Sequence, residues 1–141
     1  MIYIDSNYWI YWLDSRLPEH RHVITPMRKA IREGVAVNYV TLFEVAHYLR
    51  MLPKQEFFDL MENIRSLSTL NISNLDDHIA DSALKMVPEC APIGLGGRDC
   101  VILATMKALG INRIATHDQA FKKIDWVEVI DDIPERNEVK G

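Results

Sequence analysis

The sequence contains few cysteines and no long hydrophobic run. Its two cysteines, Cys90 and Cys100, have neither a CxxC spacing nor a neighbouring histidine pair, which argues against a zinc site. No apolar stretch approaches the roughly 18 to 20 residues that cross a bilayer, and the N-terminus lacks the pattern of a secretory signal. We therefore expect a cytoplasmic protein with reduced thiols and no association with a membrane.

Positive charge is also in short supply. The chain has 16 Lys and Arg against 20 Asp and Glu, which gives a formal net charge of -4. Because basic side chains drive binding to nucleic acid, this composition predicts no general attraction to it. An enzyme that acts on nucleic acid would need a local basic patch or metal ions at its site. Arg28, Lys29 and Arg32 could form such a patch, as could Arg50 with Lys54, but a solvated helix face explains them more simply.

Glycine is sparse, and its one dense run is GLGG at 94–97. This run lacks the Lys-Ser/Thr pair of a phosphate-binding P-loop and follows no predicted strand. We interpret it as a tight turn that leads into the next helix.

Short apolar runs alternate with longer amphipathic stretches, in a chain whose 141 residues suit one domain, 1–141. The predicted strands are residues 2–4, 35–40, 68–73, 112–116 and 126–130. The predicted helices are residues 8–13, 19–33, 41 up to Pro53, 54–67, 74–87 and 98–109, with a short helical turn at 117–124. Strands separated by helices indicate an α/β fold with a mainly parallel sheet covered by helices on both faces.

Four acidic residues fall at corresponding places in this pattern. Asp5 directly follows the first strand, and Glu44 is expected in the first turn of the helix after the second strand. Asp99 opens the helix after the glycine run, and Asp118 lies two residues beyond the strand at 112–116. Since strand C-termini and the N-termini of the following helices share one edge of a parallel sheet, we expect the four carboxylates at that edge.

Such a cluster needs a counter-charge. Neighbouring carboxylates repel one another and raise their own pKa values unless a cation compensates. Oxygen ligands without His or Cys favour Mg²⁺ or Mn²⁺ over zinc. The sequence therefore predicts a divalent-metal site built from carboxylates.

Each acid also has a structural explanation. Glu44 with Thr41 fits a capping box, Asp118 could cap the turn that follows it, and Asp99 could be a first-turn acid that interacts with the helix dipole. Asp5 is the hardest to explain in this way, because an acid directly after an apolar strand is unusual in a buried position. The joint pattern is stronger than any single member.

Three stretches of the chain resemble the acidic motifs of a known family. They are IYIDSNYWIYWL, VTLFEVAHYL and GRDCVILATMKALGINRIATHDQAF, and they resemble PIN-domain nucleases in order and spacing. The resemblance covers essentially the whole chain, and in length and layout it is similar to the toxin ribonucleases of VapBC-type toxin–antitoxin pairs. It implies a three-layer α/β/α fold with a mainly parallel central sheet of four to five strands.

The same resemblance implies roles for individual residues. The implied metal ligands and catalytic residues are Asp5, Glu44, Asp99 and Asp118. The implied supporting residues are Asn7 and Thr116, the implied anchor of the last turn is Phe121, and the local candidates for phosphate contact are Arg98 and His117. Ala120 departs from the pattern, because relatives often carry a second acid there. This departure leaves open whether the site holds one metal ion or two.

The implied activity is metal-assisted hydrolysis of RNA that leaves a 5′-phosphate and a 3′-hydroxyl. A toxin role competes with housekeeping RNA processing and with a non-catalytic binding module. A phosphoaspartate enzyme with Asp5 as nucleophile is a further alternative, but it needs a proton donor two residues on, where this chain has Asn7.

The helices on either side of Pro53 are more apolar than one buried stripe requires. The residues concerned are Phe43, Tyr48, Leu49, Phe57, Phe58 and Met61. Core packing explains them, and so does a surface for a homodimer or an antitoxin, as the resemblance implies. We expect Trp9, Trp12 and Trp126 to lie in the core.

Overall fold

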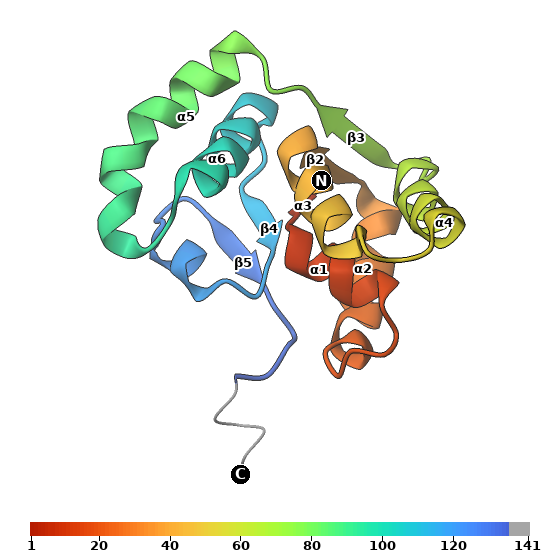
Figure 1. Ribbon diagram of the computed structural model, residues 1–141. Coiled ribbons are helices and arrows are strands. Elements are labelled where there is room, and N and C mark those ends of the chain that lie inside the picture. Colours follow the sequence, from red (N-terminus) through yellow and green to blue (C-terminus); the bar gives the residue numbers. More distant parts are fainter. Residues whose placement is uncertain (136–141) are drawn as a thin grey trace.

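The computed structural model describes residues 1–135, which form a five-stranded parallel sheet with helices on both faces (Figure 1). The strands are β1 Ile2–Ile4, β2 Val35–Asn38, β3 Leu70–Ser73, β4 Arg113–Ala115 and β5 Glu128–Ile130. Their order is β3-β2-β1-β4-β5, and every neighbouring pair is parallel. The predicted parallel sheet is confirmed. The single domain over 1–141 stays a prediction, and its last six residues lie outside the described ones.

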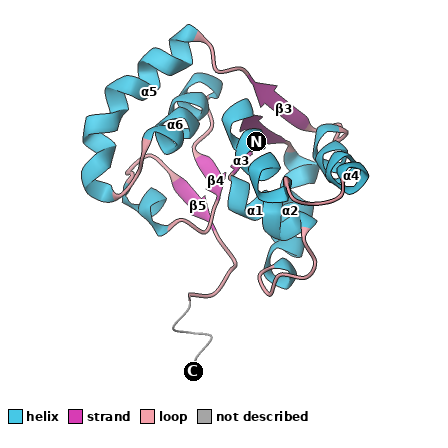
Figure 2. Ribbon diagram, in the orientation of Figure 1, coloured by secondary structure: helices cyan, strands magenta, loops and turns pink. Residues whose placement is uncertain are grey.

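Six α-helices and two short 3₁₀ helices connect the strands within these residues (Figure 2). The α-helices are α1 Ser6–Leu13, α2 His20–Glu33, α3 Tyr39–Leu49, α4 Lys54–Arg65, α5 Asp77–Cys90 and α6 Gly97–Leu109, and the 3₁₀ helices are η1 Ala91–Ile93 and η2 Gln119–Lys123. No helix in this part of the chain is long and apolar enough to cross a membrane.

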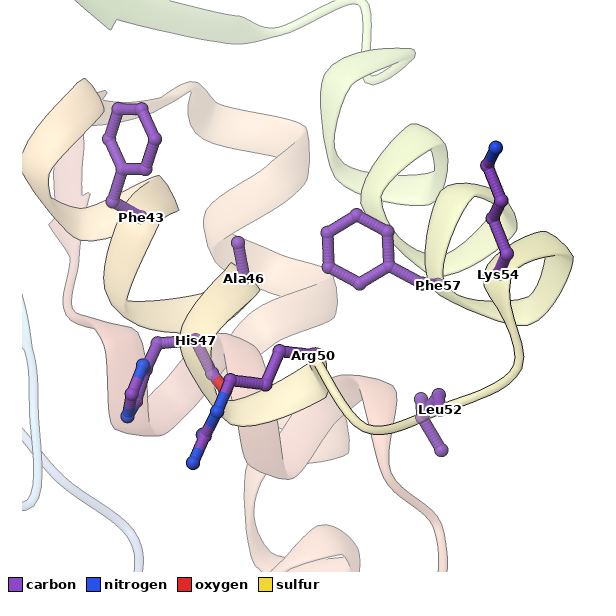
Figure 3. A pocket seen from close by; sticks show the side chains of 7 residues that line it. All are labelled: Phe43, Ala46, His47, Arg50, Leu52, Lys54 and Phe57. Atoms are coloured by element: carbon purple, nitrogen blue, oxygen red, sulfur yellow. The ribbon is translucent and has the colours of Figure 1, made fainter.

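Helices α3 and α4 divide their apolar side chains between the core and the surface. Leu49 is buried, and Phe57 and Met61 pack against the core. Phe43, Tyr48 and Phe58 are exposed. A groove of about 520 Å³ runs between the two helices, with Ala46 and Phe57 facing one another across it (Figure 3). Core packing therefore explains only part of the apolar excess.

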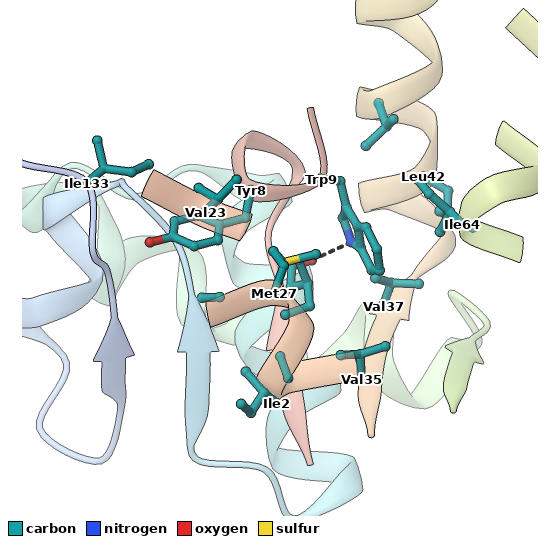
Figure 4. Close-up of a cluster of buried hydrophobic side chains, with 14 of the residues drawn as sticks. Ile2, Tyr8, Trp9, Val23, Met27, Val35, Val37, Leu42, Ile64 and Ile133 are labelled. Carbon is teal, nitrogen blue, oxygen red and sulfur yellow. Dashed lines mark hydrogen bonds between the residues drawn. The ribbon is translucent and has the colours of Figure 1, made fainter. Parts of the chain in front are cut away.

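Alternation along the strands creates two cores, one on each face of the sheet. Ile4 and Val37 face the core that α1 to α4 cover, where Trp9 is fully buried and donates from Nε1 to the Ile4 carbonyl over 3.1 Å (Figure 4). Tyr3 and Ile114 face the core that α5 and α6 cover. The α/β/α layering is confirmed.

The remaining core residues behave as their types suggest. Trp12 and Trp126 are only partly buried and pack against the two cores, whereas Trp9 lies in the core as expected. Cys90 and Cys100 are buried, free thiols in the core beneath α5 and α6.

Candidate active site

A row of polar residues crosses the carboxyl edge of the sheet, with one residue for each strand. The strand register continues one step beyond Ile4, Ala115 and Ile130, and the ladder bonds from Asp5 N to Ala115 O (3.0 Å) and from Thr116 N to Ile130 O (3.3 Å) extend it. In sheet order, the row is Ser73, Asn38, Asp5, Thr116 and Asp131. The edge where the candidate acids were expected is therefore polar throughout.

Asp5 occupies the middle of this row and is only 5% exposed. It caps α1 through a 2.7 Å bond from the Ser6 N–H to Oδ1, and the Thr116 hydroxyl donates to Oδ2 over 2.7 Å. Burial raises the pKa of Asp5 to about 6. The bonds from Thr116 and Ser6 lower this pKa, whereas the carboxylates of Glu44 and Asp99 raise it. Asp5 is thus a buried acid beside other acids.

Glu44 lies one turn further along α3 than expected. Asn38 caps this helix by accepting from the Val40 N–H over 3.0 Å, so the helix begins at Tyr39. Glu44 is therefore in the second turn, and the prediction of the first turn is wrong. The capping-box interpretation is wrong as well, because Thr41 is buried inside the helix with its hydroxyl 2.7 Å from the Tyr3 hydroxyl. Burial raises the pKa of Glu44, and so does Asp99.

Asp99 and Asp118 both act as local caps. Asp99 Oδ2 accepts from the Gly96 N–H over 3.0 Å at the start of α6. Asp118 Oδ1 accepts from the Ala120 N–H over 3.0 Å at the start of η2. Burial raises the pKa of Asp99, and the carboxylate of Asp118 raises it further. These two acids therefore combine the structural role with a position among the other carboxylates.

Thr116 and Asn7 connect the start of α1 to the end of β4. Besides donating to Asp5, the Thr116 hydroxyl accepts from Asn7 Nδ2 (3.3 Å) and from the Asp118 N–H (3.1 Å). Asn7 Oδ1 accepts from the His117 N–H over 3.2 Å. Both residues thus fix the geometry around Asp5.

The two candidates for phosphate contact each meet a carboxylate. Arg98 Nη1 lies 3.3 Å from Glu44 Oε2, with the Arg98 side chain 72% exposed. His117 Nδ1 lies 2.8 Å from Asp131 Oδ2. Phe121 is fully buried, as expected of an anchor for the last turn.

Asp131, which directly follows β5 in the polar row, is not among the predicted site residues. The stretch VEVID repeats the pattern of IYID, an apolar strand that ends on an acid, and this pattern could have revealed it. Asp131 is bound by Tyr8 and Gln119 as well as by His117.

The chemistry of the donors suits a hard divalent cation. Within residues 1–135, no three His, Cys, Asp or Glu side chains converge closely enough to hold a metal ion. The four candidate acids do influence one another, since Glu44 and Asp99 raise the pKa of Asp5 and Asp118 raises that of Asp99. Mg²⁺ is usually held by one or two carboxylates and keeps several waters. Because the four acids offer only oxygen donors, they fit Mg²⁺ or Mn²⁺ better than zinc.

Comparisons with known proteins agree with the fold. Ribonuclease VapC6 of Methanocaldococcus jannaschii is 42% identical over 48 residues, which are 33% of this chain and 31% of that protein. The crystal structure of Mycobacterium tuberculosis VapC20, a sarcin-ricin loop cleaving toxin, has a TM-score of 0.70 at 14% identity and covers 81% of this chain and 87% of its own. A toxin–antitoxin complex from Klebsiella pneumoniae has a TM-score of 0.63 at 20% identity and covers 91% and 96%.

The family model described as PIN domain matches residues 2–127, which include β1 through η2 and all four candidate acids. The match to VapC6 spans less than a third of that relative, and the two solved structures share the fold at low identity. On the match of the family model, this chain belongs to the PIN domain family.

Proposed function

We propose that this chain is a divalent-metal-dependent endoribonuclease and the toxin of a type II toxin–antitoxin pair. The observation that carries the proposal is Asp5, a buried carboxylate whose pKa is raised further by Glu44 and Asp99. Within residues 1–135 no ion pair reaches Asp5. Membership of the PIN domain family and the similarity to a protein named as a ribonuclease support the same activity.

Asp5, Glu44, Asp99 and Asp118 would hold Mg²⁺ or Mn²⁺, as one ion or two. When bound, the cation supplies the positive charge that a phosphodiester needs at this edge, and it makes a water more acidic. Its charge would also remove the electrostatic penalty that burial imposes on Asp5.

The protein side chains orient the acids and the substrate. The Thr116 hydroxyl holds Oδ2 of Asp5, and Asn7 holds Thr116, so Asp5 cannot turn away from the edge. Arg98 is exposed beyond its contact with Glu44, and a guanidinium can bind two phosphate oxygens at once. Attack of water on phosphorus would release the 3′-oxygen as a hydroxyl and leave a 5′-phosphate.

The proposal is tested with a single-stranded RNA and total RNA, each incubated with Mg²⁺ or Mn²⁺ and with EDTA. We expect cleavage only with the metal ion, and a loss of at least 100-fold in Asp5→Asn, because a residue of the reacting site is lost. Binding of Mn²⁺ is measured on the same proteins. Intact RNA with either metal would favour the non-catalytic binding module, and equal Mn²⁺ binding by both proteins would contradict the site.

Two alternatives are distinguished by other observations. A phosphoaspartate enzyme needs a proton donor two residues after its nucleophile. This chain has the amide of Asn7 there, which bonds to Thr116 and to the His117 N–H. A housekeeping nuclease should leave growth unaffected when it is expressed alone. A toxin should arrest growth until the product of a small neighbouring reading frame is expressed with it.

We propose the groove between α3 and α4 as the binding site of the antitoxin. Its walls combine apolar side chains with basic ones, and the lining residues are Phe43, Ala46, His47, Arg50, Leu52, Lys54 and Phe57 (Figure 3). A segment with alternating apolar and acidic residues complements this groove. Similarity to the fold of a toxin–antitoxin complex supports such a partner.

The groove is tested by reversing its charge in Arg50→Glu with Lys54→Glu. We expect at least a tenfold weaker affinity for the product of the neighbouring reading frame. Arg28→Glu with Lys29→Glu, which changes two exposed residues of α2, is the matched control and should bind normally. Equal weakening in both variants would indicate a general charge effect. Light scattering with and without Phe43→Glu tests whether the exposed apolar surface instead makes the expected homodimer.

A further inference from the structure

Asp131 is a fifth carboxylate at the site edge, and it differs from the other four in having all its acceptor positions filled. Its side chain is 5% exposed. Oδ1 accepts from the Tyr8 hydroxyl (2.8 Å) and the Ile133 N–H (3.1 Å). Oδ2 accepts from His117 Nδ1 (2.8 Å) and Gln119 Nε2 (3.2 Å). Since a carboxylate offers about four lone-pair sites, Asp131 has none left for a cation.

Two of these donors flank a proposed metal ligand. His117 immediately precedes Asp118 and Gln119 immediately follows it, and Gln119 Nε2 also donates to the His117 carbonyl over 3.0 Å. Asp131 therefore accepts hydrogen bonds from the side chains of both neighbours of Asp118. Two further bonds hold the backbone of this turn: Asn7 Oδ1 accepts from the His117 N–H, and the Thr116 hydroxyl accepts from the Asp118 N–H.

Tyr8 connects Asp131 to α1, the helix that Asp5 caps. Its hydroxyl donates to Asp131 and accepts from the Asp132 N–H over 2.9 Å. Tyr8 lies in the first turn of α1, three residues after Asp5. One buried carboxylate thus joins the element that presents Asp5 to the turn that presents Asp118.

The turn at 116–118 needs such an anchor. It lies between β4 and η2, and Thr116 is its only residue whose N–H continues the strand ladder, through the 3.3 Å bond to the Ile130 carbonyl. A ligand held within about 0.5 Å of its working position requires neighbours that are themselves locked by packing and hydrogen bonds. The three bonds at Asp131 from Tyr8, His117 and Gln119 meet this requirement.

We propose that Asp131 is a positioning residue, which holds His117 and Gln119 so that Asp118 keeps its place relative to Asp5. Because protein donors fill its acceptor positions, Asp131 would act through His117 and Gln119 and not on the cation itself. The inference rests on the proposed function only in what it implies for metal affinity, because the positioning itself exists without a metal ion.

The test compares Asp131→Asn with Asp14→Asn. Asp14 is a matched control, because it is also a buried aspartate (7% exposed) that accepts from a tyrosine hydroxyl, that of Tyr48, but it lies at the other end of α1. Amide hydrogen exchange of the metal-free proteins is measured at Asp118, followed by titration with Mn²⁺. We expect Asp131→Asn to speed exchange at Asp118 at least tenfold and to weaken Mn²⁺ binding about fivefold to tenfold. After correction for any change in global stability, measured by urea unfolding, Asp14→Asn should change both by less than twofold.

His117→Ala provides a milder variant in case Asp131→Asn does not fold. It removes one donor and should speed exchange at Asp118 by a smaller factor, and in the double variant the two effects should not add, since both act through one contact. Exchange at Asp118 that stays within twofold of wild type in Asp131→Asn would overturn the proposal, as would equal changes in Asp14→Asn. If wild type binds no Mn²⁺, the proposed function fails, but the exchange rates still decide the positioning role.

Discussion

Helix α1 is flanked by two buried aspartates with opposite electrostatics. Asp5 caps its N-terminus and Asp14 its C-terminus, and they are 5% and 7% exposed. The pKa of Asp14 is lowered, first of all by its bonds from Arg16, whose Nε and Nη2 lie 2.9 and 3.1 Å from its two oxygens. The pKa of Asp5 is raised to about 6, mainly by burial and to a smaller extent by the charges of Glu44 and Asp99.

The difference shows which of the two carboxylates has its negative charge compensated by a cation of the chain. Asp14 has its counter-charge within the chain, so its role ends with joining α1 to the following turn and to Tyr48. Asp5 is buried without an ion pair from residues 1–135 and is held rigidly among like charges. An acid that is held in place yet left uncompensated indicates a functional site better than burial or charge alone.

The largest effect that sharpens this contrast is expected from Asp5→Asn. Raising the pKa of a carboxyl from about 4 to about 6 costs the folded protein about 3 kcal/mol at neutral pH. This group stabilises the fold most fully below pH 4, and that contribution is lost as the pH rises through about 6. Without metal, the free energy of unfolding of Asp5→Asn at pH 7 should therefore exceed that of wild type by about 1–3 kcal/mol. The range allows for weaker hydrogen bonds from Thr116 and Ser6 to the amide. Urea unfolding at pH 4 and 7 measures this.

Asp14→Asn is the matched control for this prediction. A lowered pKa contributes stability above the usual range of Asp, and that stability is lost as the pH falls through the folded value. Asp14→Asn should therefore destabilise the protein at pH 7, by about 1 kcal/mol from the weakened bond with Tyr48 alone, and the difference should shrink in acid. Destabilisation at pH 7 by both variants would show that Asp5 is not an uncompensated charge.

Much of the fold and the place of the site follow from local patterns. Apolar runs such as IYI and VAV define strands, and an acid directly after the first run marks the carboxyl edge. The position of Asp5 required no knowledge of distant contacts, because strand polarity alone fixes which edge it occupies. Asp99 and Asp118 were also expected near their helix starts for the same reason.

The details that were missed depend on contacts between distant residues. TLFE fits a capping box in which Thr41 would cap the helix after the second strand. In the structure the Tyr3 hydroxyl bonds to the Thr41 hydroxyl and accepts from the Asn38 N–H, and Asn38 is the cap. Asp131 acquires its role from Tyr8 and His117, which are 123 and 14 residues away along the chain. Pairings of this kind cannot be found from periodicity or composition.

The smallest expected effect concerns Arg98, which pairs with Glu44, one of the four candidate acids. Its guanidinium pairs with Glu44 over 3.3 Å, but the side chain is 72% exposed, and exposed pairs contribute about 0–1 kcal/mol. Arg98→Ala should therefore leave the unfolding free energy almost unchanged, while Mn²⁺ binds about twofold to fivefold more tightly because a competing charge is removed from Glu44. Arg98→Lys keeps the charge and should bind Mn²⁺ like wild type. A calorimetric titration with Mn²⁺ measures this. Weaker binding by Arg98→Ala would mean that Arg98 orients Glu44 for the cation, and the pair of Arg98 with Glu44 would then differ from the pair of Arg16 with Asp14 only in its exposure.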